Sequence, residues 1–109
     1  MLAHDFGIMR TEPIKGKRYN NYNTQKYNCI SVHYDDILPL LEKLKCIKCY
    51  WQTLDRPEFG LDYYGITLIP PESLNGFIEI IWNNHNLSDL IALLIEAENG
   101  KNFVIHFGI

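Results

Sequence analysis

The chain has 109 residues, and its 47% hydrophobic and 21% charged content is ordinary for one globular domain. This composition excludes a disordered chain and a fibrous protein. The first residues lack the basic and apolar parts of a signal peptide, and no window approaches the roughly 20 apolar residues of a membrane span. The odd number of cysteines, three, fits a reducing compartment better than a set of disulfides. Together these features predict a single cytosolic domain over residues 1–109 that does not contact a membrane.

Charge is distributed unevenly along the chain. Residues 1–34 carry five basic and two acidic groups, whereas residues 35–109 carry five basic and eleven acidic groups. A body of charge −6 therefore follows a leading segment of charge +3. Because nucleic acids require a basic surface, the acidic body argues against a nucleic-acid partner. It favours a basic protein partner, although acidic surfaces also serve solubility alone.

The first third of the chain predicts an irregular segment, a strand and a helix. Residues 10–28 show no apolar period, so residues 1–26 are predicted to form an irregular or flexible leading segment, with room for an edge strand at 6–9. Alternation over 29–33 predicts a strand. A helix is predicted to begin at Asp35 or Asp36, with Pro39 in its first turn and an apolar stripe formed by Ile37, Leu40, Leu41 and Leu44.

Two strands are predicted next, at residues 46–53 and 62–69, with Tyr64 facing the core in the second strand. The loop of about eight residues between them permits an antiparallel hairpin but no helical crossover. Helical periodicity then predicts one helix from Pro71 and another from Asn86 or Ser88 to residues 99–100.

The last element is predicted to be a strand at 103–107, apolar enough to be covered on both faces, against which the last helix packs. The order of elements predicts an α+β fold, with helices packed on one face of a small sheet of about four to five mainly antiparallel strands.

Candidates for catalysis and metal binding are sparse. Cys46 and Cys49 have the C-x-x-C spacing of zinc ligands, but a strand would direct them to opposite faces and Cys29 is the only other cysteine. We therefore predict structural thiols and no metal or cofactor. The histidines are dispersed, at positions 4, 33, 85 and 106, and no catalytic residue is assigned to them.

Acidic and aromatic residues are interleaved between the two middle strands. This is the composition of a protein interface, in which buried rings supply area while carboxylates set the register against Lys or Arg. The predicted partner-binding residues are Asp55, Glu58, Phe59, Asp62, Tyr63 and Glu72. A structural role is the alternative, because Arg56 can pair with Glu58 or Asp62 inside the protein.

The stretch from Tyr63 to Leu74, YYGITLIPPESL, and the small acidic α+β pattern over residues 27–109 resemble the immunity proteins of bacterial polymorphic-toxin and contact-dependent growth inhibition systems. The resemblance implies an inhibitor that binds a cognate toxin, commonly a basic nuclease, and covers its active site. It carries over no individual residue. Two alternatives stay open: a small hydrolase or nuclease that uses His33, His85 or His106, and a regulatory module that binds a ligand in an apolar pocket.

Overall fold

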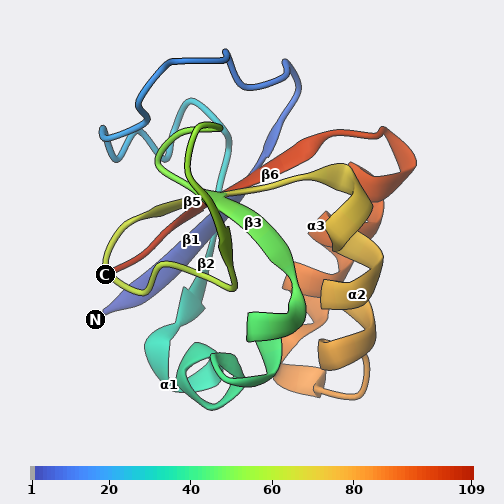
Figure 1. Ribbon diagram of the computed structural model, residues 1–109. Helices are drawn as coiled ribbons and strands as arrows, with labels where there is room; N and C mark the ends of the chain where they lie inside the picture. Colours follow the sequence, from blue (N-terminus) through green and yellow to red (C-terminus); the bar gives the residue numbers. More distant parts are fainter. Residues whose placement is uncertain (1) are drawn as a thin grey trace.

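A computed structural model describes residues 2–109 and shows one six-stranded antiparallel sheet with three α-helices (Figure 1). The strand order across the sheet is β2-β1-β6-β5-β3-β4. The α+β class is therefore confirmed, with slightly more strands than the four to five predicted. The strands are β1 (Ala3–Met9), β2 (Ile30–His33), β3 (Lys48–Trp51), β4 (Pro57–Phe59), β5 (Ile66–Ile69) and β6 (Phe103–Phe107). The helices are α1 (Tyr34–Ile37), α2 (Pro71–Ile81) and α3 (Ser88–Asn99), with 3-10 turns η1 (Leu38–Leu40), η2 (Lys43–Cys46) and η3 (His85–Leu87).

The leading strand β1 lies inside the sheet, between β2 and β6, so the prediction of an edge strand at 6–9 was wrong. Phe6 pairs with Ile30 on one side and with His106 on the other. Position 7 accepts only glycine here, because a Cβ atom would lie 2.6 Å from the Cβ of Tyr27. Whether a strand lies inside a sheet or at its edge depends on which distant segments pair with it, and the apolar pattern of the strand itself does not indicate this.

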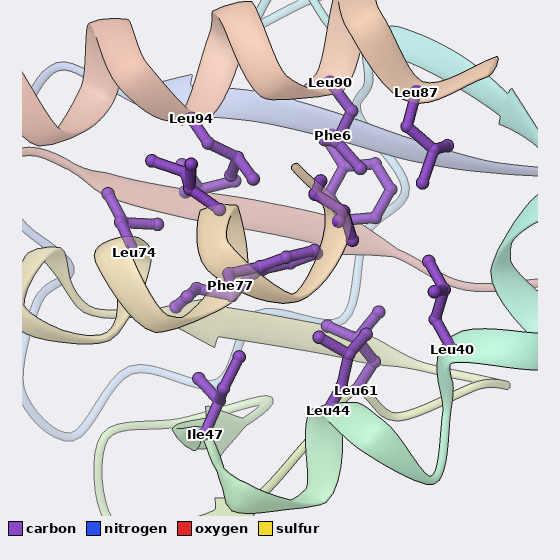
Figure 2. Packing of buried hydrophobic residues seen from close by; sticks show 14 of the residues in the cluster. Phe6, Leu40, Leu44, Ile47, Leu61, Leu74, Phe77, Leu87, Leu90 and Leu94 are labelled. Atoms are coloured by element: carbon purple, nitrogen blue, oxygen red, sulfur yellow. The ribbon is translucent and has the colours of Figure 1, made fainter. Parts of the chain in front are cut away.

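The sheet is covered on both faces. Helices α2 and α3 lie on one face, where Phe6, Phe77, Leu90 and Leu94 are part of the larger core (Figure 2). On the other face the segment 10–28 covers a second core, formed by Met9, Tyr19, Ile66, Leu68, Ile105 and Phe107. Burial of each large apolar side chain contributes about 1.5–3 kcal/mol, so both layers stabilise the domain.

Helix α3 packs on the face of β6 that carries Val104. This confirms the prediction that the last helix packs on the last strand. Phe103, Ile105 and Phe107 point to the opposite core instead. A strand that is apolar on both faces gives no sequence signal for which face the helix takes.

The helix predicted from Asp35 or Asp36 is split into α1, η1 and η2. It starts earlier, because the Nδ1 atom of His33 accepts a hydrogen bond from the Asp35 N–H at 3.1 Å and caps the first turn. With this start, Pro39 falls beyond the first turn, where its missing N–H interrupts the α-helical pattern. The chain tightens there into the 3-10 turn η1.

The predicted strands at 46–53 and 62–69 are shortened to β3 and β5, which pair antiparallel as expected. Residues 62–65 form a turn, closed by the Gly65 N–H and the Asp62 carbonyl at 3.2 Å. Tyr64 is therefore 77% exposed, and its predicted core position was wrong. The supposed loop between the two strands contains β4, which pairs with the outer edge of β3.

Candidate functional site

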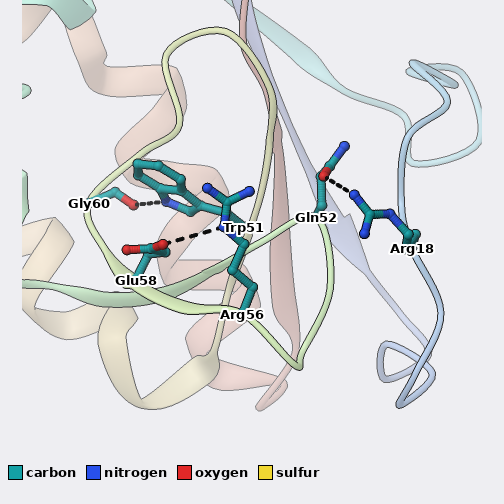
Figure 3. A network of polar contacts seen from close by, with 6 residues as sticks. All are labelled: Arg18, Trp51, Gln52, Arg56, Glu58 and Gly60. Atoms are coloured by element: carbon teal, nitrogen blue, oxygen red, sulfur yellow. Dashed lines mark hydrogen bonds and ion pairs between the residues drawn. The ribbon is translucent and has the colours of Figure 1, made fainter.

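The β3–β4 hairpin is held in shape by interactions around Trp51 (Figure 3). The Trp51 Nε1–H group donates to the Gly60 carbonyl at 3.0 Å, and its backbone N–H donates to the Arg56 carbonyl at 3.0 Å. The Arg56 guanidinium lies 5.4 Å from the Trp51 ring centroid, and its Nε atom lies 3.4 Å from a Glu58 carboxylate oxygen. Glu58 is thus paired inside the hairpin, which is one of the structural roles considered above.

Strand β4 is an edge strand with a reduced capacity for main-chain pairing. Backbone hydrogen bonds join Trp51 to Arg56 and Ile47 to Gly60, so the intervening Pro57 and Phe59 direct their main-chain groups away from β3. Pro57 has no N–H, which leaves the Phe59 N–H as the one donor on the outer edge of this strand. Such an edge disfavours the addition of a further strand, so any partner contact here depends on side chains.

Neighbouring residues of β4 project to opposite faces. Glu58 pairs with Cys49, whose side chain belongs to the core under the helices, whereas Phe59 pairs with Lys48 on the other face. The Phe59 ring is 60% exposed. Among the predicted interface residues, Phe59 is therefore the large apolar group that is free to contact a partner.

The first turn of α2 lies beside the same end of the hairpin. The Ser73 hydroxyl donates to the Lys48 carbonyl at 2.6 Å, which places the exposed Glu72 next to the strand position that pairs with Phe59. Asp55 is exposed at the hairpin turn, where its N–H donates to the Thr53 hydroxyl at 3.3 Å. We name Asp55, Glu58, Phe59 and Glu72 the hairpin surface, although Glu58 and Phe59 project to opposite faces of the hairpin.

Asp62 and Tyr63 lie apart from the hairpin surface, beside the C-terminus. The Tyr63 carbonyl accepts the Ile109 N–H at 2.9 Å, and an Asp62 carboxylate oxygen accepts the Tyr64 N–H at 3.2 Å. Burial, followed by the charges of nearby groups, raises the pKa of Tyr63. The six predicted residues therefore do not form one continuous face, and two of them serve the packing of the turn before β5.

A buried polar chain connects β1, β6 and β5 on the helix side of the sheet. The His4 Nδ1 and His106 Nε2 atoms are 2.8 Å apart, and His106 Nδ1 lies 3.2 Å from the Thr67 hydroxyl, which accepts the Asp62 N–H at 2.8 Å. The Nε2 atom of His4 has no hydrogen-bond partner among residues 2–109. Both rings are fully buried.

Burial lowers the pKa of His106 well below 6.5, and the neighbouring His4 lowers it further. Burial also lowers the pKa of His4, although Asp5 opposes this shift. Both imidazoles are neutral at pH 7. Because the His106 ring is buried against the sheet, it cannot contact a substrate, and this argues against His106 as a catalytic residue of the predicted hydrolase.

His85 is the histidine that shares a cleft with a carboxylate. The open cleft, about 510 Å³, lies between η1–η2 and the end of α2, and is lined by Leu40, Lys43, Glu79, Ile80, Asn83, Asn84, His85 and Asn86. An imidazole and a carboxylate in one cleft are groups that acid–base catalysis uses.

The cysteines do not form a C-x-x-C ligand pair. Cys46 is exposed, whereas Cys49 is buried in the core under the helices, where desolvation raises the pKa of its thiol to about 12. Burial likewise raises the pKa of Cys29 to about 11. Within residues 2–109, no three His, Cys, Asp or Glu side chains are placed to hold a metal ion.

No protein-family model, curated protein or solved structure matches the chain significantly. The resemblance to immunity proteins therefore stays a prediction. Among the helices of residues 2–109, none has the length and apolar character needed to cross a membrane.

Sequence reasoning missed β4 and the layer formed by residues 10–28. Strand β4 has three residues, too few for an alternating pattern, and begins with a proline that usually indicates a loop. The covering layer has no secondary structure, but its three tyrosines, Tyr19, Tyr22 and Tyr27, were a signal that it packs on the sheet.

Proposed function

We propose that the protein binds another protein through the hairpin surface and thereby inhibits it, as an immunity protein that neutralises a cognate basic toxin. The observation that carries this proposal is the Phe59 ring, which is 60% exposed on an edge strand, while the turn of the same hairpin and the adjoining first turn of α2 carry the exposed Asp55 and Glu72. A phenyl ring has no polar atom to hydrate, so its exposure is best compensated by a partner.

The acidic groups of the hairpin surface favour a basic partner, while Lys48 is the charged residue that pairs with Phe59 on its own face. Within residues 2–109, neither Asp55 nor Glu72 forms an ion pair, whereas Glu58 is partly neutralised by Arg56. Carboxylates at the rim of an interface accelerate association with a positively charged surface. A toxin that acts on RNA or DNA presents such a surface at its active site, and covering it would block the substrate.

The test uses a candidate toxin taken from the genes that flank this one, and the absence of any such gene would count against the proposal. We expect the protein to protect cells from that toxin, and the Asp55→Asn/Glu72→Gln double variant to associate several-fold more slowly at low salt. The difference should shrink as the Debye length falls from about 30 Å at 0.01 M to about 8 Å at 0.15 M. An Asp36→Asn/Asp89→Asn variant removes two charges elsewhere and should associate like the wild type. Equal rates for both variants would exclude the hairpin surface.

A second candidate function is a hydrolase or nuclease centred on His85. The specific observation is the cleft that His85 shares with Glu79 and Lys43. In this case purified protein should cleave RNA or a phosphodiester without any partner, and His85→Asn should abolish turnover. Full toxin neutralisation by the His85→Asn variant would instead favour the binding function.

A further inference from the structure

The segment 10–28 concentrates positive charge on one face of an acidic protein. From residue 13 to residue 34 the chain has four basic residues, Lys15, Lys17, Arg18 and Lys26, and no acidic one. This segment covers the sheet face opposite α2 and α3. Lys26 also lines a cleft with Asp89 and Glu96 of α3, so the end of the segment borders the acidic groups of that helix.

The segment is fixed to the sheet by several hydrogen bonds. The Tyr19 N–H donates to the Gln52 carbonyl at 2.7 Å, and the Tyr19 hydroxyl accepts the Ile14 N–H at 2.9 Å. The Tyr22 hydroxyl donates to the Tyr64 carbonyl at 3.3 Å. Because Tyr19 is also buried in the second core, the neighbouring Lys17 and Arg18 project from an anchored backbone.

Three of the four cations line a small cavity of about 110 Å³ between this segment and β6. The Lys17 Nζ atom lies 4.9 Å from the Tyr19 ring centroid, and the Lys26 Nζ atom lies 5.5 Å from the Tyr27 centroid, so cation–π contacts hold both ammonium groups. Arg18 donates one N–H to Gln52 at 2.9 Å. The lining consists of Lys17, Arg18, Tyr19, Asn20, Asn21, Asn23, Lys26, Tyr27 and Ile105.

No carboxylate lines the small cavity. Among residues 2–109, no carboxylate forms an ion pair with Lys17, Arg18 or Lys26. Like charges that line one small cavity repel each other, and an anion bound between them would relieve the repulsion. The asparagine side chains add amide N–H donors to the ammonium and guanidinium donors of the same cavity.

A second cavity of about 330 Å³ is next to the first and shares Lys17, Tyr19, Lys26 and Tyr27 with it. Its lining includes the apolar Ile8, Met9 and Ile14 together with the charged Arg10 and Glu12. The larger volume lies within the range of small-molecule sites, which are mostly apolar with a few placed polar groups. The small cavity thus offers cations, and the larger one adds apolar and aromatic groups with one carboxylate.

We propose that these two cavities bind a phosphorylated small molecule. Its phosphate group lies between Lys17, Arg18 and Lys26, and its apolar or aromatic part enters the larger cavity beside Tyr19 and Tyr27. A phosphate group matches this site because its oxygens accept several hydrogen bonds and its negative charge compensates the three cations. The proposal is independent of toxin binding, since it concerns different side chains.

Calorimetry at low salt with three probes tests the site: adenosine 5′-monophosphate, inorganic phosphate and adenosine. We expect the monophosphate to bind at least ten times more tightly than adenosine, and to shift the side-chain amide NMR signals of Asn20, Asn21 and Asn23. A free phosphate source is distinguished by its own titration: if inorganic phosphate binds as tightly as the monophosphate, the small cavity alone is the site.

The matched variants are Lys17→Gln/Lys26→Gln and, as a control with the same loss of charge, Lys45→Gln/Lys101→Gln. All four lysines are exposed, so both proteins should fold, which circular dichroism verifies. We expect a loss of at least tenfold in monophosphate affinity for the first variant and less than twofold for the control. Equal affinity of both variants, or no preference for the monophosphate over adenosine, would overturn the proposal. Neither result would affect the toxin-binding test.

Discussion

Acidification should unfold the protein through its buried histidines. His106 and His4 are neutral in the folded state because burial lowers their pKa values below the ordinary 6.5. In the unfolded chain both rings protonate as the pH falls through 6.5. The unfolded state then binds more protons than the folded state, so the stability present above pH 6.5 is lost progressively below it.

The size of the effect follows from linkage. One histidine that stays neutral in the folded protein changes the free energy of unfolding by up to about 1.4 kcal/mol per pH unit. Between pH 7 and pH 5, His106 alone should lower the free energy of unfolding by about 2 kcal/mol. His4 adds a smaller amount, because Asp5 favours its charged form. For a domain of this size the total is a large share of the stability.

Urea unfolding at pH 7, 6 and 5 measures this dependence. The His106→Gln variant should be less stable at pH 7, because it disturbs the contacts to His4 and Thr67, yet it should lose about 2 kcal/mol less on going to pH 5. The His85→Gln variant, changed at an exposed histidine, should keep the wild-type pH dependence. An identical pH dependence for wild type and His106→Gln would refute the reasoning.

Three further predictions concern packing and thiol chemistry. Leu94, a residue of α3, is fully buried, so Leu94→Ala should lower the free energy of unfolding by about 2–5 kcal/mol in urea unfolding. An unchanged unfolding midpoint would disprove its core position. Gly76→Ala should stabilise the protein by roughly 0.5–1 kcal/mol and raise the melting temperature, because position 76 lies inside α2 and the atom nearest to the new Cβ is 3.9 Å away. Gly7→Ala should lower the melting temperature, because the new Cβ would clash with Tyr27. A shift of the same sign for both variants would contradict this prediction. A thiol reagent at pH 8 should modify Cys46 rapidly and Cys49 only after unfolding, and fast labelling of Cys49 in the folded protein would show that its burial is misassigned.

The elements with strong helical periodicity were predictable from sequence. Helix α2 begins at Pro71 as expected, and α3 ends at Asn99, just before the glycine that marked its end. The position of the helix predicted around Pro39 was not predictable, because its start depends on the N-cap formed by His33 and the local sequence pattern does not indicate this cap. The second layer over the sheet also escaped prediction, since residues 10–28 contribute tyrosines to a core without any period.

The candidate site was predicted only in part. Phe59 and its acidic neighbours were found from composition, but composition does not tell which side chains share a face. Glu58 and Phe59 are adjacent in a strand and therefore project to opposite faces. Asp62 and Tyr63 lie in a turn, where the alternating sequence pattern had predicted a strand, and they make packing contacts there. The structural alternative for Glu58 was foreseen, since the folded chain pairs it with Arg56, whose guanidinium also lies against the Trp51 ring.

The central claim is that Phe59 anchors a protein partner, and it can be tested against an aromatic side chain of equal exposure. Trp82, at the end of α2, is 58% exposed and lies outside the hairpin surface. Surface plasmon resonance with the neighbouring toxin candidate should show an affinity loss of roughly 30-fold or more for Phe59→Ala, equivalent to about 2 kcal/mol, and little change for Trp82→Ala. Wild-type affinity of Phe59→Ala, or an equal loss in both variants, would contradict the account.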